Sequence, residues 1–273
     1  MIPHIHRRSF GSGPRPALAI HCSLAHSGAW RAMGAAVGDC VTLHAFDLPC
    51  HGKSGDWDRT GIMHDTATDM ARAVLDDMGE GPIDVIGHSF GATVALRLAI
   101  EDPQRIRSLT MFEPVYFAPA MADDPEFAAS HAATMAPYDA AMARGDRIGA
   151  ARAFNRAWGD TTGWDTIPEG TRAYMAERIQ FVADSAPMLI DDSAGLLEPG
   201  RFARATMPAL LMRGAHSGWM RDVNTAIARR LPDARDTVLP GVGHMGPITH
   251  PETVAKAWLT FLAEHQARQR ATG

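Results

Sequence analysis

Short apolar segments alternate with segments of helical periodicity along the first 112 residues, and this alternation restricts the fold more than any other feature. The apolar segments lie at residues 17–22, 41–46, 83–86 and 108–112, and helical character occurs at 27–37, 67–78 and beyond residue 91. A strand is expected again at 208–212, a helix at 221–231, a last strand at 237–239 and an amphipathic helix at 251–265. Strands separated by helices build a mainly parallel sheet with helices on both faces. The sequence therefore predicts an α/β fold.

The second of these helices has a predicted start. Its apolar positions recur with the helical period from Ala67 to Met78. Thr66 and Asp69 have the spacing of a capping box, in which two side chains satisfy free N–H groups of the first turn. We therefore expect this helix to begin beside Thr66.

The alternation stops between residues 115 and 206, where the chain is rich in alanine, methionine and aspartate and has helical patterning. We interpret this stretch as a helical insertion. A length of 273 residues fits one large α/β domain with an insertion better than two independent domains. The expected organisation is a core of residues 1–114 and 207–273 interrupted by an insertion at 115–206.

Charge and hydropathy exclude several kinds of partner. The chain has 26 lysine and arginine residues against 31 aspartate and glutamate residues, a formal charge of −5, and its basic residues are scattered. This composition argues against a nucleic-acid partner. An apolar stretch long enough for a membrane span or a signal peptide is missing. We expect a cytoplasmic protein that binds a small molecule, and the sequence leaves its oligomeric state open.

Metal and disulfide chemistry are not expected. Cys22, Cys40 and Cys50 form no Cys-x-x-Cys pair. His4 and His6 are close in sequence but lack a third ligand. The sequence predicts neither a metal site nor a cofactor.

The segment Gly87-His88-Ser89-Phe90-Gly91 matches the pattern G-x-S-x-G, and it lies directly between a predicted strand and a predicted helix. In such a turn the serine is held in a strained backbone conformation, and the glycines remove side chains that would collide with the strand and helix. The serine hydroxyl then projects above the carboxyl edge of the sheet. We predict that Ser89 is a nucleophile in a nucleophile elbow; a structural turn that tolerates serine is the alternative.

A serine hydroxyl needs a base to accept its proton. The chain has 13 histidines, and His244 follows a predicted strand within a glycine-rich loop at residues 241–247. We therefore predict that His244 is the base. His88 is expected to pack beside the elbow, and His21 and His51 to be loop or capping residues.

These residues together resemble the α/β-hydrolase family. The segment Asp47-Leu48-Pro49-Cys50-His51-Gly52-Lys53-Ser54 is similar to that family's D-x-P-G-H-G-x-S loop, and the first strand ends in His21-Cys22-Ser23. Cys22 and Cys50 stand where the family usually has glycine. The resemblance implies an α/β-hydrolase fold, with a mostly parallel twisted sheet flanked by helices and with the insertion as a helical cap over the pocket.

By position in that family, the backbone N–H groups of Ser23 and Phe90 form the oxyanion hole, with Leu24 as the substitute for Ser23. Two such fixed dipoles stabilise the charge that develops on an attacked carbonyl oxygen.

The acid of the catalytic triad has more than one candidate. Most family members carry an aspartate after the strand that corresponds to residues 208–212, in a Gly-x-x-Asp pattern, but here Ser217 occupies that place. Some members take the acid from the end of the preceding core strand, where this chain has Glu113. Asp222 is the alternative acid, and a dyad or a water-assisted histidine is the third possibility.

Methionine and aromatic residues of the insertion predict an apolar pocket roof or the packing of the cap on the sheet, and Trp30 and Trp219 are candidates for the pocket rim. The resemblance implies a serine hydrolase that cleaves a small, largely apolar ester, thioester or lactone through an acyl-enzyme intermediate. C–C bond hydrolysis, perhydrolysis and non-catalytic binding of a small molecule are the alternatives. Haloalkane dehalogenase and epoxide hydrolase chemistry in this family need aspartate as the nucleophile.

Overall fold

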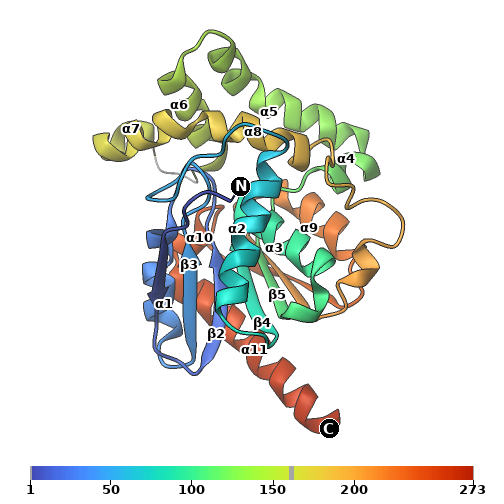
Figure 1. Ribbon diagram of the computed structural model, residues 1–273. Helices are drawn as coiled ribbons and strands as arrows, with labels where there is room; N and C mark the ends of the chain where they lie inside the picture. Colours follow the sequence, from blue (N-terminus) through green and yellow to red (C-terminus); the bar gives the residue numbers. More distant parts are fainter. Residues whose placement is uncertain (1, 160–162, 273) are drawn as a thin grey trace.

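A seven-stranded, mostly parallel sheet forms the centre of the protein in a computed structural model, which describes residues 2–159 and 163–272 (Figure 1). The strands are β1 (Arg7–Phe10), β2 (Arg15–Ile20), β3 (Val41–Phe46), β4 (Ile83–His88), β5 (Ile106–Phe112), β6 (Ala209–Gly214) and β7 (Ala234–Leu239). Their order is β1-β3-β2-β4-β5-β6-β7; β1 pairs antiparallel with β3 and the other pairs are parallel. The predicted α/β fold is therefore confirmed.

Helices cover both faces of this sheet. One face carries α1 (Arg31–Val37), α10 (Gly246–Thr249) and α11 (Pro251–Thr272), and the other carries α2 (Met63–Asp77), α3 (Phe90–Glu101) and α9 (Met220–Ala228). Strand β2 contributes to both layers, because Ala17 and Ala19 pack with the first group and Leu18 and Ile20 with the second. Strands buried on both faces read as continuous apolar runs, which explains why this part of the fold was predictable.

Trp30 belongs to this core rather than to a pocket rim. It closes the short 3-10 helix η1 (Ser27–Trp30) and is 2% exposed among residues of α1 and α11. The expectation that Trp30 lines the pocket rim is therefore wrong, since the packing of η1 against the sheet turns the indole inward.

The chain between β5 and β6 contains helices and no strand in its described residues. It forms α4 (Ala118–Asp123), α5 (Pro125–Ala143), α6 (Arg147–Trp158), α7 (Glu169–Arg178) and α8 (Gln180–Leu189), with 3-10 helices η3 (Trp164–Thr166) and η4 (Phe202–Arg204). Figure 1 shows α5 to α8 together over one end of the sheet. Residues 1, 160–162 and 273 of the expected core and insertion lie outside the described residues.

Several boundaries differ from the sequence prediction: β7 begins at Ala234 rather than at residue 237, and α9 ends at Ala228 rather than at residue 231. Helix α2 begins at Met63 rather than beside Thr66, because Met63 and His64 are buried and their packing extends the helix by one turn. The proposed capping box is therefore wrong. Strand β1 was not predicted; its four residues alternate between exposed and half-buried positions at the edge of the sheet, so they carry little hydrophobic signal.

Candidate active site

The residues singled out in the sequence meet at the carboxyl edge of the sheet. Ser89 follows β4, Glu113 follows β5, and Ser23 and His244 lie in the loops after β2 and β7. In open α/β sheets this edge is the usual place for a ligand site, because the loops there converge from several strands.

Ser89 occupies a strained turn between β4 and α3, with φ 55° and ψ −118°. Two glycines make the turn possible. A Cβ atom on Gly87 would lie 2.4 Å from the carbonyl oxygen of Gly91, and one on Gly91 would lie 2.2 Å from the carbonyl oxygen of Ile20. The strain is held by the sheet, because the Ser89 N–H donates to the Phe112 carbonyl at 2.9 Å. The hydroxyl is therefore fixed at the sheet edge.

His244 joins Ser89 to Glu113. The Ser89 hydroxyl lies 3.1 Å from Nε2 of His244, and Nδ1 of the same ring lies 2.7 Å from Oε2 of Glu113. With Nδ1–H donating to the carboxylate, Nε2 is free to accept the serine proton. His88 supports this loop, since its Nε2–H donates to the backbone carbonyl of His244 at 2.8 Å. Burial, followed by the nearby His244, holds the pKa of His88 well below its usual value, so His88 is a neutral support.

Glu113 has a partner for each carboxylate oxygen. Oε2 accepts from His244, and Oε1 accepts from the backbone N–H of Gly214 at 2.7 Å. The residue has φ 46° and its side chain is 0% exposed, so it is a buried carboxylate rather than a surface one. Asp222, the alternative acid, lies in the first turn of α9, where it pairs with Arg221 at 3.2 Å and is 43% exposed. Of these two acids, the structure brings Glu113 to His244.

The loop after β2 is held in a particular path. Leu24 has φ 61°, and its N–H donates to Nε2 of His51 at 3.0 Å. This bond engages the Leu24 N–H, so Leu24 does not replace Ser23 as an oxyanion donor. Ser23 and Ser89 line the same cavity. Phe90 is the first residue of α3, where backbone N–H groups have no partner within the helix.

Sequence reasoning missed the role of two histidines. His51 Nδ1–H donates to the carbonyl of Pro49, and His21 accepts from the Leu48 N–H at 2.9 Å and donates to the Cys22 carbonyl at 2.7 Å. Burial lowers the pKa of His21 to about 4 and that of His51 to about 3, which keeps both rings neutral. Both histidines lie within the segments that resemble the α/β-hydrolase family, and this resemblance was the sequence signal that could have indicated their role.

Asp47 completes the connection between the two loops. Its carboxylate accepts from the N–H of Ser27 at 2.7 Å and from the N–H of Lys53 at 2.8 Å. Burial alone would raise the pKa of Asp47, but these hydrogen bonds outweigh it and the pKa is lowered. The loops after β2 and β3 are therefore tied together by an ionised carboxylate.

A cavity of about 650 Å³ opens over Ser89. Apart from glycine and polar backbone, its wall is built mainly from apolar and aromatic side chains: Cys22, Leu24, Ala25, Ala29, Phe154, Trp158, Ile167, Tyr174, Met175, Met245 and Ile248. Among the described lining residues there is no aspartate, glutamate, lysine or arginine. The cavity therefore suits an uncharged, largely apolar molecule.

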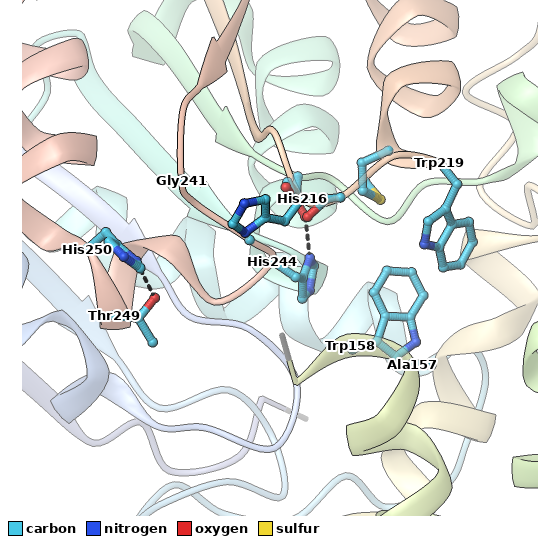
Figure 2. Close-up of a pocket in the computed structure, with 12 residues that line it drawn as sticks. Ala157, Trp158, His216, Trp219, Gly241, His244, Thr249 and His250 are labelled. Atoms are coloured by element: carbon cyan, nitrogen blue, oxygen red, sulfur yellow. Dashed lines mark hydrogen bonds and ion pairs between the residues drawn. The ribbon is translucent and has the colours of Figure 1, made fainter. Parts of the chain in front are cut away.

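A second cavity of about 440 Å³ lies beside His244, with Glu113, Ser217 and Met220 in its lining (Figure 2). In Figure 2 the indoles of Trp158 and Trp219 lie to one side of His244, and Thr249 and His250 lie to the other. Trp158 lines both cavities, and its ring is centred 4.9 Å from that of His244. His244 and Thr249 also line both cavities, so these three residues lie where the cavities adjoin.

Within residues 2–159 and 163–272, no group of three or more histidine, cysteine, aspartate or glutamate residues is arranged to hold a metal ion. In the same part of the chain, none of the helices has the length and apolar character needed to cross a membrane.

Comparison with known proteins gives relatives that carry esterase and lipase names. Lipase LipV of Mycobacterium tuberculosis is 34% identical over 115 residues, which is 42% of this chain and 43% of that lipase, so the alignment spans less than half of the relative. The pimeloyl-acyl-carrier-protein methyl ester esterase of Edwardsiella ictaluri is 26% identical over 264 residues, covering 92% of this chain and 94% of that protein.

Among solved structures, an alpha/beta hydrolase of Sphaerobacter thermophilus superimposes with a TM-score of 0.69 at 24% identity, covering 94% of this chain and 96% of that one. This likeness concerns the fold. The family model described as "Alpha/beta hydrolase family" matches residues 17–257, which include strands β3 to β7 and all of β2 except Arg15 and Pro16. A match over this length shows that the chain belongs to the alpha/beta hydrolase family.

Proposed function

We propose that this protein is a serine hydrolase that cleaves a small, largely apolar carboxylic ester, thioester or lactone. The observation that carries the proposal is the continuous hydrogen-bonded line from Ser89 through His244 to Glu113 at the floor of an apolar cavity. The esterase and lipase names of the relatives support ester hydrolysis. No cofactor enters the proposed reaction.

In the proposed mechanism, Ser89 Oγ attacks the substrate carbonyl while His244 Nε2 accepts the hydroxyl proton. The negative charge on the carbonyl oxygen is held by the backbone N–H groups of Ser23 and Phe90. His244 then gives its proton to the leaving alcohol, thiol or lactone oxygen, and an acyl-enzyme on Ser89 remains. Glu113 fixes the ring orientation and stabilises the imidazolium form of His244.

Deacylation uses the same groups in the opposite direction. A water molecule gives a proton to His244 as it attacks the acyl carbonyl, and the tetrahedral intermediate collapses with return of that proton to Ser89 Oγ. The products are a carboxylic acid and the regenerated serine hydroxyl.

The apolar wall supports the substrate class. A cavity of about 650 Å³ without acidic or basic side chains among its described lining residues gives a charged substrate group no partner, and burying an unpaired charge is costly. The helices between β5 and β6 contribute Phe154, Trp158 and Tyr174 to this wall. We therefore assign residues 115–206 the role of a cap domain over the site.

A fluorophosphonate probe tests the proposal, because it phosphonylates an activated serine. The wild-type protein is expected to be labelled at one residue, with loss of hydrolysis of p-nitrophenyl butyrate, and Ser89→Ala is expected neither to be labelled nor to hydrolyse the ester. The absence of labelling in a wild-type protein with a normal melting transition would contradict the proposal and would favour a binding protein.

A further inference from the structure

Tyr174 of the cap helix α7 is hydrogen-bonded to two loops of the core. Its hydroxyl donates to the backbone carbonyl of Ala25 at 2.9 Å and accepts from the backbone N–H of Gly52 at 2.9 Å. Ala25 and Gly52 are 149 and 122 residues away from Tyr174 in the sequence. A single phenol therefore connects the cap to the loop after β2 and to the loop after β3.

Both loops support the proposed oxyanion hole. Ala25 lies two residues beyond Ser23, and Gly52 follows His51, whose Nε2 holds the N–H of Leu24. The Tyr174 hydroxyl thus holds the loop after β2 at Ala25, and His51 holds the same loop at Leu24, next to Ser23. Any shift of α7 acts directly on the backbone that carries one oxyanion donor.

The neighbouring cap helix makes a second contact with the same machinery. The ring of Phe181 in α8 is centred 4.4 Å from His51 and 4.8 Å from Phe90, each in an edge-to-face arrangement. His51 supports the loop of Ser23, and Phe90 carries the other proposed donor. Helices α7 and α8 therefore both contact residues that support or carry the proposed oxyanion donors.

The Tyr174 ring is itself held in place. The guanidinium carbon of Arg178, one turn later in α7, lies 3.8 Å from the centre of the ring, and the His26 ring approaches it edge-on at 6.2 Å. Tyr174 also lines the cavity over Ser89. These contacts hold the phenol in place, so it acts as a rigid connection.

We propose that Tyr174 is a positioning residue that fixes the oxyanion loop, residues 22–29, to the cap, so that transition-state stabilisation depends on the cap. The inference rests on the proposed function. Tyr174 does this through its hydroxyl, by holding the Ala25 carbonyl and the Gly52 N–H at the same time.

The expected effect falls on kcat rather than on KM. The oxyanion hole binds the charge that develops in the transition state, so loosening it raises the barrier and leaves substrate binding nearly unchanged. Removal of one donor costs about 10²–10³ in rate, and a displaced donor costs part of that. Tyr174→Phe is expected to lower kcat about 10- to 100-fold with KM within about threefold of the wild-type value.

Tyr138→Phe is the matched control. Tyr138 is the other tyrosine in the described cap helices. It is buried against α7, and its hydroxyl donates to the Ile179 carbonyl at 3.3 Å within the cap. Tyr138 lines neither of the two cavities that adjoin His244. Like Tyr174→Phe, Tyr138→Phe removes one phenol hydroxyl from the cap. Tyr138→Phe is expected to keep kcat within about twofold of the wild-type value.

Hydrogen exchange supplies a readout that does not depend on turnover. Because the Gly52 N–H donates to Tyr174, Tyr174→Phe is expected to speed exchange at Gly52 and in the segment 22–29, and Tyr138→Phe is not. Unchanged kcat and exchange in Tyr174→Phe would overturn the inference, as would a rise in KM alone, which marks a simple substrate contact.

The failure of this inference differs from failure of the proposed function. A wild-type protein that neither reacts with the fluorophosphonate nor hydrolyses esters overturns the proposed function, and the inference falls with it. A wild-type protein that reacts through Ser89, together with a fully active Tyr174→Phe variant, overturns this inference alone.

Discussion

Glu113 illustrates how a single side chain can serve both the site and the sheet. The carboxylate is fully buried, yet each of its oxygens accepts one hydrogen bond, from the His244 ring and from the N–H of Gly214. Burying a carboxylate without such partners would cost several kcal/mol. The residue therefore orients the histidine and also ties the end of β5 to the end of β6.

Glu113→Gln is expected to lower kcat for a p-nitrophenyl ester by about 10⁴, with little change in KM. The neutral amide neither stabilises imidazolium nor fixes the tautomer that leaves Nε2 free for the serine proton. Steady-state kinetics at pH 8 measure both constants.

The control for this prediction is Asp222→Asn. Asp222 is paired with Arg221 at the surface of α9, so its substitution is expected to leave kcat within about twofold of the wild-type value. Near-normal activity of Glu113→Gln would show that Glu113 is not the acid of the triad.

At the scale of elements, α6 shapes the space around the site. Trp158, its last residue, lines both cavities and packs against His244, Phe117 and Trp219. Trp158 has the largest side chain of the three residues that line both the cavity of about 650 Å³ and the cavity of about 440 Å³. Trp158 is therefore expected to limit the length of substrate that the site accepts.

Trp158→Ala is expected to join the two cavities and to favour longer acyl chains. The ratio of kcat/KM for p-nitrophenyl octanoate to that for the butyrate should rise about tenfold or more, because each additional buried CH₂ contributes about 0.8 kcal/mol. Using a ratio cancels any general loss of activity that follows from removing a contact of His244.

Trp164→Ala is the matched variant for this experiment. Trp164 is buried in a separate cluster of the cap with Tyr138 and Ile179, and its loss should leave the chain-length ratio unchanged. An unaltered ratio in Trp158→Ala would mean that the indole does not limit substrate length.

Elements buried on both faces were predictable, and elements defined by contacts far along the chain were not. Strands β2 to β6 have dense apolar runs, whereas β1 is a short, polar edge strand that is specified mainly by its pairing with β3. Helix α2 begins where tertiary burial of Met63 places it, not where local capping chemistry indicates.

The same distinction holds in the site. Ser89 and His244 were found because each stands in a local pattern directly after a strand, and Glu113 because Ser217 replaces the expected aspartate. Tyr174 has no such pattern. Its significance arises from two hydrogen bonds to loops more than a hundred residues away, and these depend on how the cap lies on the core.

At the scale of the whole molecule, several histidines are buried in the neutral state. Burial lowers the pKa of His21 to about 4 and the pKa values of His51 and His64 to about 3, and it holds the pKa of His88 well below its usual value. In the unfolded chain a histidine has a pKa of about 6.5. Below that pH the unfolded state therefore binds protons that the folded state does not.

Stability is consequently expected to be full above about pH 6.5 and to fall as the pH decreases towards 4. Each of these rings lowers the free energy of unfolding by up to about 1.4 kcal/mol per pH unit in this range. Urea denaturation at pH 7.5, 6.0 and 5.0 measures the slope.

His64→Gln should reduce the dependence of the free energy of unfolding on pH by up to about 1.4 kcal/mol per pH unit, the contribution of one ring. His64 is suitable for this test because it is buried beside Phe90 and does not belong to the proposed triad. A free energy of unfolding that stays constant from pH 7.5 to 5.0 would contradict the prediction.

The position of the acid after β5 has a consequence for how this architecture can diversify. Since the hydrogen bond from this part of the chain to the carboxylate comes from the backbone N–H of Gly214, the last residue of β6, the side chains at 215–219 take no part in proton transfer. His216, Ser217 and Trp219 nevertheless face the second cavity. Substitutions in this turn can therefore change which substrates fit the second cavity while the reactive groups stay unchanged. This makes the turn a natural target for the redesign of selectivity.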